Sequence, residues 1–554
     1  MERIWLDHYP PGIPADIESE AAACASLVAM FEKNCADYAQ RTAFVSMGAS
    51  LSYAQVERHS RHFAAWLQSI GVRKGDRVAL MLPNLLQYPV CLFGTLRAGA
   101  VVVNTNPLYT AHELEQQLAD SGATTIVLAE NFAQTLQQAL PRTVIKNIVI
   151  TSIGEMLGPL KGRITDLVVR HVKKRVPPWT LPGALRLRRV LAKGASASFS
   201  PVALDHNDLA FLQYTGGTTG IAKGAMLSHG NMVANLCQAH AWVQPYVSND
   251  GDEYIVTALP LYHIFALTAN CLTFMHLGAC NLLIVNARDT PALIAEMGKV
   301  RFTAITGVNT LFNALLNHPD FSKLDFSHLK FTLGGGMAVQ GAIAQRWLDT
   351  TGKPLAQAYG LTETSPAVTI NPLDKIDFDG SIGLPVPSTD ISVRGPDNLE
   401  LALGETGELC VRGPQVTAGY WRRPQETADA FHSDGFLRTG DIGYVDERGY
   451  VFLLDRKKDL IIVSGFNVYP NEVEAAAMQH PGIREAAAIG VPHERAGEVV
   501  KLFVIRKDPA LTEQDVIAHC RTLLTGYKVP RQVEFREDLP RTNVGKILRR
   551  ALKE

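Results

Sequence analysis

The clearest chemical signal in the sequence is a loop that combines glycines, threonine hydroxyls and a lysine. Its residues are Tyr214, Thr215, Gly216, Gly217, Thr218, Thr219, Gly220, Ile221, Ala222, Lys223 and Gly224. Glycine accepts backbone angles that let several N–H groups face one anion, while hydroxyls add donors and lysine adds positive charge. The loop follows the apolar run 209–213, which predicts a buried strand. We therefore expect a polyphosphate site, although Lys223 lacks the P-loop spacing, rather than a plain surface loop.

Three further segments carry groups that suit a nucleotide. His263 lies between aromatic residues in the segment 260–265, where a histidine is more often a core residue than a functional one. The segment 331–336 reads as a strand that ends in a triple glycine, which allows close approach of a flat ligand. In the segment 357–364, Tyr359 offers a face for a base and Glu363 offers oxygens for Mg²⁺. Taken singly, each segment fits ordinary loop chemistry equally well.

The last third of the chain adds two carboxylates and a lysine. Asp441 follows the turn-forming segment 435–440, and the strand predicted over 450–456 ends in the pair Asp455 and Arg456. Lys546 follows a glycine near the end of the sequence, where it could be mere surface charge. These groups become informative only in combination with the earlier ones.

Length and composition limit the architecture and the partners. A chain of 554 residues is too long for one ordinary core, so we expect at least two domains. The net charge of −1 gives no reason to expect a nucleic acid partner. The eight cysteines are scattered without metal-ligand spacing, which favours free thiols in a reducing compartment. With no signal-peptide pattern at the N-terminus, we expect a cytoplasmic protein.

The elements that would position these residues alternate between strands and helices up to about residue 380. This alternation predicts layered α/β subdomains with mostly parallel strands. Shorter segments separated by Gly and Pro then predict a small antiparallel barrel or sheet. The last hundred residues alternate again and predict a compact α+β domain. We therefore divide the chain into 1–455 and 456–554.

Two segments raise the question of a membrane. Residues 254–287 contain no charged side chain, but polar residues and a proline interrupt them, so we expect a buried strand, a loop, a buried helix and another strand. Residues 161–193 carry ten basic residues against the single acid Asp166, together with apolar residues and Trp179. Such a segment can sit on an anionic lipid surface, while a solvated charged face remains slightly favoured.

Taken together, the motifs resemble one family, the adenylate-forming enzymes that include acyl-CoA synthetases, luciferase and peptide-synthetase adenylation domains. The chain looks most similar to bacterial long-chain fatty acid–CoA ligases. The resemblance rests on the segments 214–224, 258–265, 334–336, 359–363, 439–441, 455–456, 463–470 and 543–546, which occur in the family's order. It implies a large N-terminal domain of two α/β subdomains plus a small β-barrel, followed by a mobile α+β C-terminal domain.

The resemblance also implies a role for each matching residue. The loop 215–223 would hold the β- and γ-phosphates of ATP, Thr362 would reach the α-phosphate, and Glu363 with Thr218 would bind Mg²⁺. The residues implied for the adenine slot are Gly334, Gly335, Gly336, Tyr359 and Gly360. Asp441 would bind the ribose with Arg456 nearby, and Lys546 would stabilise charge on the α-phosphate.

The same resemblance implies a moving domain. The C-terminal domain of the family rotates between two half-reactions about a position that corresponds here to Lys458, where many relatives have Asp. The rotation withdraws Lys546 and brings Gly465 to the site where coenzyme A enters. His263 occupies the family's aromatic position beside the acyl and coenzyme A channels.

The expected activity is ATP-dependent ligation of a long-chain fatty acid to coenzyme A, which feeds fatty acid β-oxidation. Its substrates would be the fatty acid, ATP and coenzyme A, with Mg²⁺ as cofactor, and contact with the inner membrane would be peripheral. The alternatives are a medium-chain or aryl acid–CoA ligase, a free-standing enzyme that loads an acyl carrier, a luciferase-like oxygenase and a non-enzymatic lipid-binding protein. The sequence leaves the oligomeric state open, a homodimer included.

Overall fold

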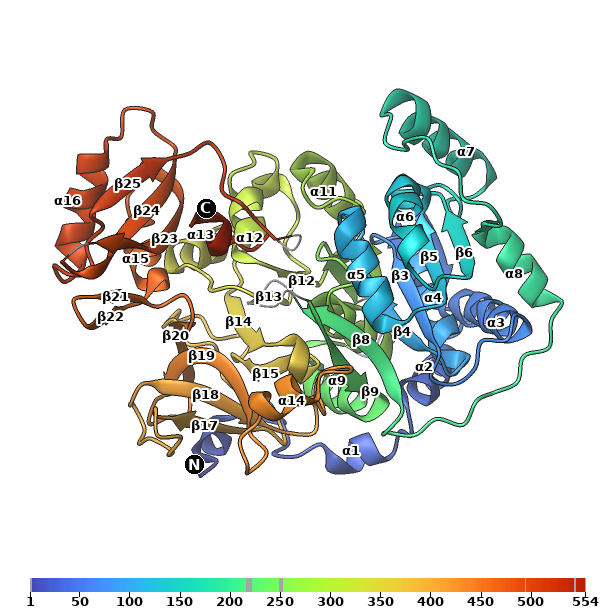
Figure 1. Cartoon of the computed structure of the whole chain (residues 1–554), viewed down its shortest axis with the longest axis horizontal. Helices are drawn as coiled ribbons and strands as arrows, with labels where there is room; N and C mark the ends of the chain where they lie inside the picture. The colour runs from blue at the N-terminus through green and yellow to red at the C-terminus, as the bar shows by residue number, and fades with distance from the viewer. Residues whose placement is uncertain (1, 216–221, 249–252, 494, 543–544, 554) are drawn as a thin grey trace.

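The structure is a computed structural model that describes residues 2–215, 222–248, 253–493, 495–542 and 545–553. Its first sheet has seven strands in the order β7-β6-β5-β3-β4-β8-β9 (Figure 1). All neighbouring strands are parallel except β8 and β9. The strands are β3 (Arg77–Met81), β4 (Val101–Asn104), β5 (Thr125–Ala129), β6 (Asn147–Thr151), β7 (Leu185–Arg186), β8 (Leu209–Thr215) and β9 (Lys223–Ser228).

The second sheet has nine strands in the order β16-β15-β14-β13-β12-β10-β11-β1-β2. Its core is parallel, and the strand pairs at both edges are antiparallel. The strands are β1 (Thr42–Ser46), β2 (Ala49–Ser52), β10 (Tyr254–Thr257), β11 (Cys280–Leu283), β12 (Ala304–Gly307), β13 (Phe331–Gly335), β14 (Leu355–Gly360), β15 (Ala367–Ile370) and β16 (Leu384–Pro385). The sequence between β2 and β10 contains the whole seven-stranded sheet.

Helices cover both sheets and begin where the sequence supplies caps. The side chains of Ser52, Thr110 and Ser228 each accept a hydrogen bond from the backbone N–H of the third helical residue. The side chain of that residue in turn accepts one from the backbone N–H of the cap. The helices up to the middle of the chain are α1 (Glu18–Ala22), α2 (Leu27–Asp37), α3 (Tyr53–Ser69), α4 (Gln87–Arg97), α5 (Ala111–Ser121), α6 (Ala133–Ala139), α7 (Pro159–Leu167), α8 (Leu187–Ala195) and α9 (His229–Val243). Those that follow are α10 (Thr273–His276), α11 (Thr290–Met297), α12 (Asn309–Leu316), α13 (Gly341–Thr351) and α14 (Pro424–Ala430).

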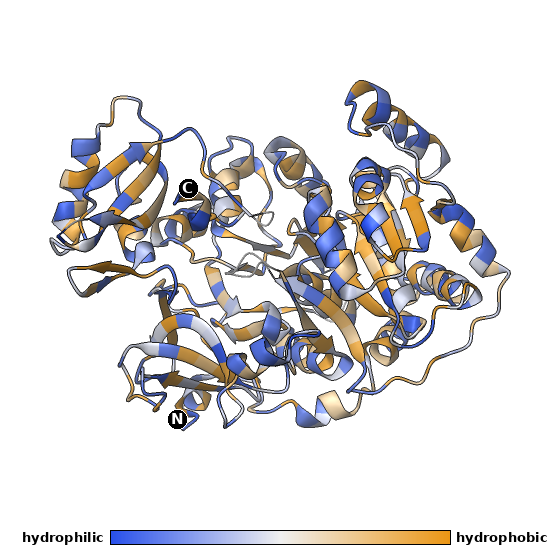
Figure 2. Cartoon of the chain, viewed as in Figure 1, coloured by the Kyte–Doolittle hydropathy of each residue, from blue (hydrophilic) through white to orange (hydrophobic). Residues whose placement is uncertain are grey.

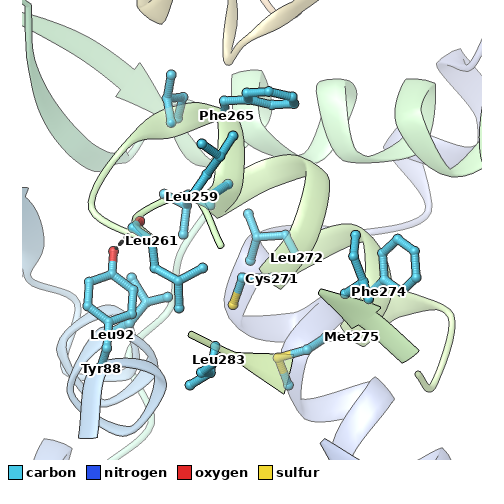
Figure 3. Close-up of a cluster of buried hydrophobic side chains, with 14 of the residues drawn as sticks. Tyr88, Leu92, Leu259, Leu261, Phe265, Cys271, Leu272, Phe274, Met275 and Leu283 are labelled. Atoms are coloured by element: carbon cyan, nitrogen blue, oxygen red, sulfur yellow. Dashed lines mark hydrogen bonds between the residues drawn. The ribbon is translucent and has the colours of Figure 1, made fainter. Parts of the chain in front are cut away.

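One hydrophobic core joins the two sheets. Figure 3 shows part of it, where Tyr88 and Leu92 of α4 face Leu259, Leu261 and the buried helical segment beyond them. The Tyr88 hydroxyl donates hydrogen bonds to Asn104 Oδ1 and to the Leu261 carbonyl, at 2.7 and 2.8 Å. Figure 2 shows the apolar residues concentrated on the strands of the sheets.

The uncharged segment 254–287 folds as the sequence predicts. It contains β10, a buried π-helical turn (Ala266–Leu272) that continues into α10, and then β11. Burial on all sides explains why the segment lacks charge. Among the described helices, none combines the length and apolar character that crossing a membrane requires.

A four-stranded antiparallel sheet occupies the region for which we predicted a small barrel or sheet. Its order is β17-β18-β19-β20, formed by β17 (Asp390–Arg394), β18 (Gly407–Arg412), β19 (Leu437–Val445) and β20 (Val451–Arg456). In the described residues the order is open between β17 and β20. Its own small apolar cluster includes Val393, Leu409 and Val451.

The C-terminal residues form a mixed sheet with helices against it, at the left of Figure 1. The elements are β21 (Ile461–Val463), β22 (Phe466–Val468), α15 (Pro470–Ala477), β23 (Ile483–His493), β24 (Gly497–Arg506), α16 (Glu513–Leu523) and β25 (Gln532–Phe535). Two apolar clusters within 461–552 fill this region without residues from the larger sheets. The division of the chain at residue 455 stays a prediction.

Candidate active site

The predicted phosphate loop connects two strands that pair antiparallel. Thr215 at the end of β8 lies opposite Lys223 at the start of β9. Gly216, Gly217, Thr218, Thr219 and Gly220 lie outside the described residues, so their predicted contacts stay predictions.

Tyr214 anchors the base of this loop. Its hydroxyl donates a hydrogen bond to Asp120 Oδ2 at 2.6 Å, and burial together with that carboxylate raises the pKa of the phenol. A Cβ atom on Gly224 would lie 3.1 Å from the Tyr214 ring, so the glycine lets the two strands approach. Arg423 holds the other Asp120 oxygen at 2.7 Å. These contacts fix the strand ends from which the loop emerges.

Tyr420 connects the predicted phosphate lysine with the predicted metal ligand. The Lys223 ammonium lies 5.4 Å from the centre of the Tyr420 ring, and the Tyr420 hydroxyl donates to Glu363 Oε1 at 2.8 Å. The backbone N–H of Thr417 donates to the Glu363 carbonyl at 2.7 Å. Glu363 and Thr362 begin a short 3-10 helix directly beyond β14. The sequence analysis did not predict Tyr420 as a site residue. The signal available for it was the run of aromatic and basic residues at 420–423, directly after Gly419.

Asp441 and Arg456 face each other across β19 and β20, with Tyr359 beside them. The Tyr359 hydroxyl donates to Asp441 Oδ2 at 2.7 Å, and Arg456 Nε lies 2.9 Å from Asp441 Oδ1. That last pair lacks hydrogen-bond geometry, so the buried Oδ1 has an ion-pair partner but accepts no hydrogen bond among the described residues. Asp441 is 1% exposed, and its charge raises the pKa of Arg456. Oδ1 can therefore accept a hydroxyl from a ligand.

The predicted adenine-binding glycines lie on neighbouring parallel strands. Gly334 is opposite Gln357 and Gly335 is opposite Ala358, so the triple glycine and Tyr359 meet at one sheet edge. A Cβ on Gly334 would lie 2.7 Å from Val339, which makes that glycine a packing requirement as well. Gly336 adopts a φ of +76°, the left-handed region that glycine favours.

Gly360 is also fixed by the protein itself. A Cβ there would lie 1.9 Å from the Pro366 carbonyl oxygen, which no shift of a flexible side chain would relieve. This glycine lets β14 turn into the 3-10 helix that carries Thr362 and Glu363. Its place in the site is therefore indirect.

Lys546 reaches the same region from the far end of the chain. Thr310 of α12 donates to the Gly545 carbonyl at 3.2 Å, which holds the Lys546 loop against the large sheet. Burial, followed by the charge of Arg456, lowers the pKa of Lys546 to about 8. Burial and the Lys546 charge together lower the pKa of His263 to about 4. Lys546 therefore lies close enough to feel the charges of Arg456 and Asp441 and to influence His263.

Two further predicted residues lie at or beyond the edge of this group. Gly465 has a φ of +85° and no atom within 4 Å of a Cβ built on it, and the neighbouring Phe466 is 57% exposed. The Phe466 ring stacks on Tyr527 of the C-terminal region with 4.9 Å between centroids. Lys458 has an exposed side chain in the turn after β20, but it borders the group, since partial burial and the charge of Arg456 lower the pKa of its ammonium group. The structure therefore assembles Lys546 with the nucleotide-type groups and leaves Gly465 at the surface.

The assembled groups have a definite chemical character. Lysine, arginine and histidine side chains converge on two carboxylates, with an aromatic residue and glycine-rich strand ends beside them. Such a site can bind an anionic nucleotide and stabilise negative charge that develops on phosphate oxygens. Glu363 binds Tyr420 through one oxygen, so the other can serve a hard cation such as Mg²⁺.

Comparisons with known proteins agree with this character. The profile described as "AMP-binding enzyme" matches residues 31–421, and the one described as "AMP-binding enzyme C-terminal domain" matches residues 472–546. A long-chain-fatty-acid–CoA ligase of Escherichia coli O157:H7 is 54% identical over all of this chain and 98% of its own length. The enzyme of the same name from Salmonella typhimurium strain LT2 is 55% identical with the same coverage.

Solved structures share the fold. The crystal structure of ATP-bound MatB from Rhodopseudomonas palustris superposes with a TM-score of 0.79 at 29% identity, over 95% of this chain and 98% of its own. The mixed α/β architecture with an α+β C-terminal part is therefore confirmed. The motifs, the full-length matches and the shared fold agree, and the chain belongs to the AMP-binding enzyme family.

Proposed function

We propose that this chain is an ATP-dependent long-chain fatty acid–CoA ligase. The observation that carries the proposal is that the buried Lys546, from the end of the chain, lies within electrostatic reach of Asp441 and Arg456 on the four-stranded sheet and of His263 after β10. A lipid-binding protein would have no need for this combination. Identity of 54% to a long-chain-fatty-acid–CoA ligase over the full chain supports the substrate class.

The reaction proceeds in two transfers. A carboxylate oxygen of the fatty acid attacks the α-phosphorus of ATP, and the bond from that phosphorus to pyrophosphate breaks. The sulfur of coenzyme A then attacks the acyl carbon, loses its proton, and displaces AMP. Both transfers build negative charge on oxygens, so positioning and fixed positive charge supply the catalysis.

Each charged group has a part in the first transfer. Lys223 and the loop 216–220 hold the β- and γ-phosphates, and Thr362 reaches the α-phosphate. Lys546 neutralises the charge that develops there and orients the attacking carboxylate. Asp441 accepts the ribose hydroxyls through Oδ1, which pairs with Arg456 but accepts no hydrogen bond among the described residues. Tyr359 and Gly334 to Gly336 enclose the adenine.

Magnesium would be held by Glu363 and Thr218. The ion supplies neutralisation of the phosphate charge when it is bound. Tyr420 fixes the orientation of the Glu363 carboxylate by bonding one of its oxygens. That arrangement supports the assignment, because an oriented carboxylate binds a cation with less loss of freedom.

The second transfer requires a change of shape. We place the domain division at residues 455 and 456 and the hinge at Lys458, in the exposed turn after β20. Rotation there withdraws Lys546 and brings Gly465 to the entrance for coenzyme A. The described arrangement, with Lys546 among the nucleotide groups and Gly465 exposed, fits the first transfer. His263 lies beside the channels for the acyl chain and coenzyme A.

A peripheral membrane contact extends the proposal. Helix α7 projects from the upper right of Figure 1. Its region exposes Leu160 (74%), Ile164 (56%), Leu167 (58%) and Val172 (69%) among lysines and arginines. We place this face on an anionic membrane surface on the cytoplasmic side, where fatty acids are delivered. Flotation with anionic vesicles should fail after Leu160→Asp and Leu167→Asp, but not after Leu399→Asp at another exposed leucine.

The activity is tested with a panel of fatty acids from C6 to C18. We expect ATP–pyrophosphate exchange that depends on added acid, and AMP release that depends on coenzyme A, both strongest with long chains. Preference for medium-chain or aryl acids would move the substrate assignment to those classes. Exchange without thioester formation would point instead to an acyl carrier or to luciferase-like chemistry, and absence of exchange would reject the enzyme proposal.

A further inference from the structure

Three side chains outside the nucleotide site form a cluster of ligand atoms. Glu20 lies on α1, His240 in the last turn of α9, and His276 at the end of α10. One ligand atom from each lies within 4.8 Å of the others. Across the part of the chain that the structure describes, this is the one such group of three or more histidine, cysteine or acidic side chains.

The spacing of the first two ligands already suits a metal ion. His240 Nδ1 lies 3.1 Å from Glu20 Oε1. Two ligands bound to a tetrahedral ion at about 2.0–2.1 Å lie about 3.3 Å apart. The His240 and His276 rings meet edge to face with 4.7 Å between centroids and 79° between planes. A small adjustment of one imidazole would therefore complete a three-ligand set.

A neighbouring amide orients the third ligand. His276 Nδ1 lies 3.2 Å from Oδ1 of Asn34, a residue of α2 that is 5% exposed. With a proton on Nδ1 donated to the amide oxygen, Nε2 keeps the lone pair that a metal requires. Metal-binding histidines commonly have such a partner on the opposite ring nitrogen.

The cluster is accessible to an ion from solvent. The side chains of His240 and Glu20 are 25% and 39% exposed, which leaves room for a water molecule as fourth ligand. Helix α1 has only five residues and packs against α9 (Figure 1). A helix this short has little stability of its own, so a cross-link to its neighbours would add substantially to its order.

We propose that Glu20, His240 and His276 bind a divalent transition metal, with Zn²⁺ as the best match, and that the ion fastens α1 to α9 and α10. Two imidazoles and one carboxylate with a water position are a ligand set that zinc accepts. The site is independent of Glu363, the proposed Mg²⁺ ligand. Without a metal, the Glu20–His240 contact would be an ordinary hydrogen-bonded pair.

Metal titration of the full-length protein tests the proposal. After treatment with a chelator, the protein should bind one equivalent of Zn²⁺ by calorimetry and elemental analysis, and its melting temperature should rise. Glu20→Gln and His276→Gln should each weaken binding at least about tenfold, because each removes one of three ligands. Co²⁺ in place of Zn²⁺ should give the absorption of a four-coordinate site.

Two further variants make the result specific. Asn34→Ala should weaken Zn²⁺ binding by about 10–100-fold while all three ligands remain, as expected for a partner that orients a ligand. His112→Gln, at an exposed histidine of α5 that contacts Gln116, should bind as the unaltered protein does. The proposal is overturned if the unaltered protein binds no more Zn²⁺ than the double variant His240→Gln, His276→Gln.

Discussion

At the scale of single residues, the environment of Lys546 connects position to protonation. Burial and the charge of Arg456 lower the pKa of its ammonium group to about 8, and Asp441 opposes this shift. A lysine with this pKa is mostly charged at pH 7 and loses its charge as the pH rises through about 8. The proposed role in charge stabilisation therefore has a direct signature in the pH dependence.

We expect the rate of acyl-adenylate formation to fall as pH rises through about 8, because the positive charge of Lys546 is present below that pKa and lost above it. ATP–pyrophosphate exchange from pH 6.5 to 10 measures this. Lys546→Arg should keep residual activity without the alkaline decline, since arginine stays charged, and Lys546→Ala should lose about 10²–10³-fold. An unchanged alkaline decline in the arginine variant would assign it to another group.

Tyr420→Phe tests how Glu363 is oriented. Loss of the hydroxyl leaves Glu363 Oε1 without its 2.8 Å hydrogen bond, so about 10-fold more Mg²⁺ should be needed for half-maximal exchange. The maximal rate at saturating Mg²⁺ should change less. Tyr444→Phe is the matched control, because that ring stacks on Phe452 away from the site. Equal effects of the two changes would contradict the role given to Tyr420.

The sequence predicted the site residues as motifs but not the contacts between them. Tyr359, Asp441 and Arg456 stand in separate motifs. The structure joins Asp441 to Arg456 by pairing β19 with β20, and Tyr359 to Asp441 by a hydrogen bond from β14. Tyr420 was missed because its partner Glu363 precedes it by 57 positions, and no spacing rule links them. Long-range hydrogen bonds depend on the fold and leave no local pattern.

At the scale of elements, Arg549 ties the C-terminal segment to β20 and α15. Its guanidinium contacts Asp455 at 3.0 Å and Glu474 at 2.8 Å, and it also bonds Asn471. Glu474 and Asp455 are both mostly buried, and burial raises the pKa of each carboxyl. Removal of the arginine would leave two carboxyl groups buried without their partner.

Arg549→Ala should therefore destabilise the C-terminal region by about 3 kcal/mol, the usual cost of breaking a buried ion pair. It should also lower adenylation, since Lys546 lies three residues earlier. Chemical denaturation followed by a probe in the C-terminal region measures the first effect. Arg536→Ala removes an exposed pair with Glu534 and should cost less than about 1 kcal/mol. Equal costs would show that the Arg549 network adds no stability.

The sequence predicted elements best where one pattern dominates a long run. The helices α2, α5 and α16 each begin after a capping residue that is visible in the sequence, namely Ser26, Thr110 and Thr512. The pairing of β1 with β11 was not predictable, since neither strand carries information about its partner. The π-helical turn at 266–272 also has no local signal that we recognised.

At the scale of the whole molecule, the two half-reactions should respond separately to changes in the C-terminal region. Lys546→Ala should slow adenylation about 10²–10³-fold and leave thioester formation from supplied acyl-AMP largely intact, because the lysine leaves the site before the second transfer. Gly465→Leu should do the reverse, by obstructing coenzyme A. Single-turnover assays of each half-reaction measure both effects. Equal loss of both half-reactions in either variant would argue against the rotation.

The predicted fold class, with α/β sheets first and an α+β part at the C-terminus, agrees with the structure, but the sequence does not show the contacts between these parts. The four-stranded sheet includes Arg456 in its last strand, and the Lys546 loop rests on Thr310 of the larger sheet's α12. A boundary drawn from composition alone cannot show such contacts, because they depend on the docked arrangement. The family resemblance implied a role for each site residue and a rotating C-terminal domain, which local patterns do not indicate.

The insertion of one sheet within another bears on how the chain is made. The strand β1 pairs with β11, yet more than two hundred residues separate them, and the whole seven-stranded sheet lies between. At ordinary translation rates, β1 and β2 wait roughly 10 to 50 s for their partner to be synthesised. The inserted sheet can pair its own strands during that interval. Synthesis that stalls before residue 280 would thus leave β1 with an unpaired edge, open to chaperones and to misassembly.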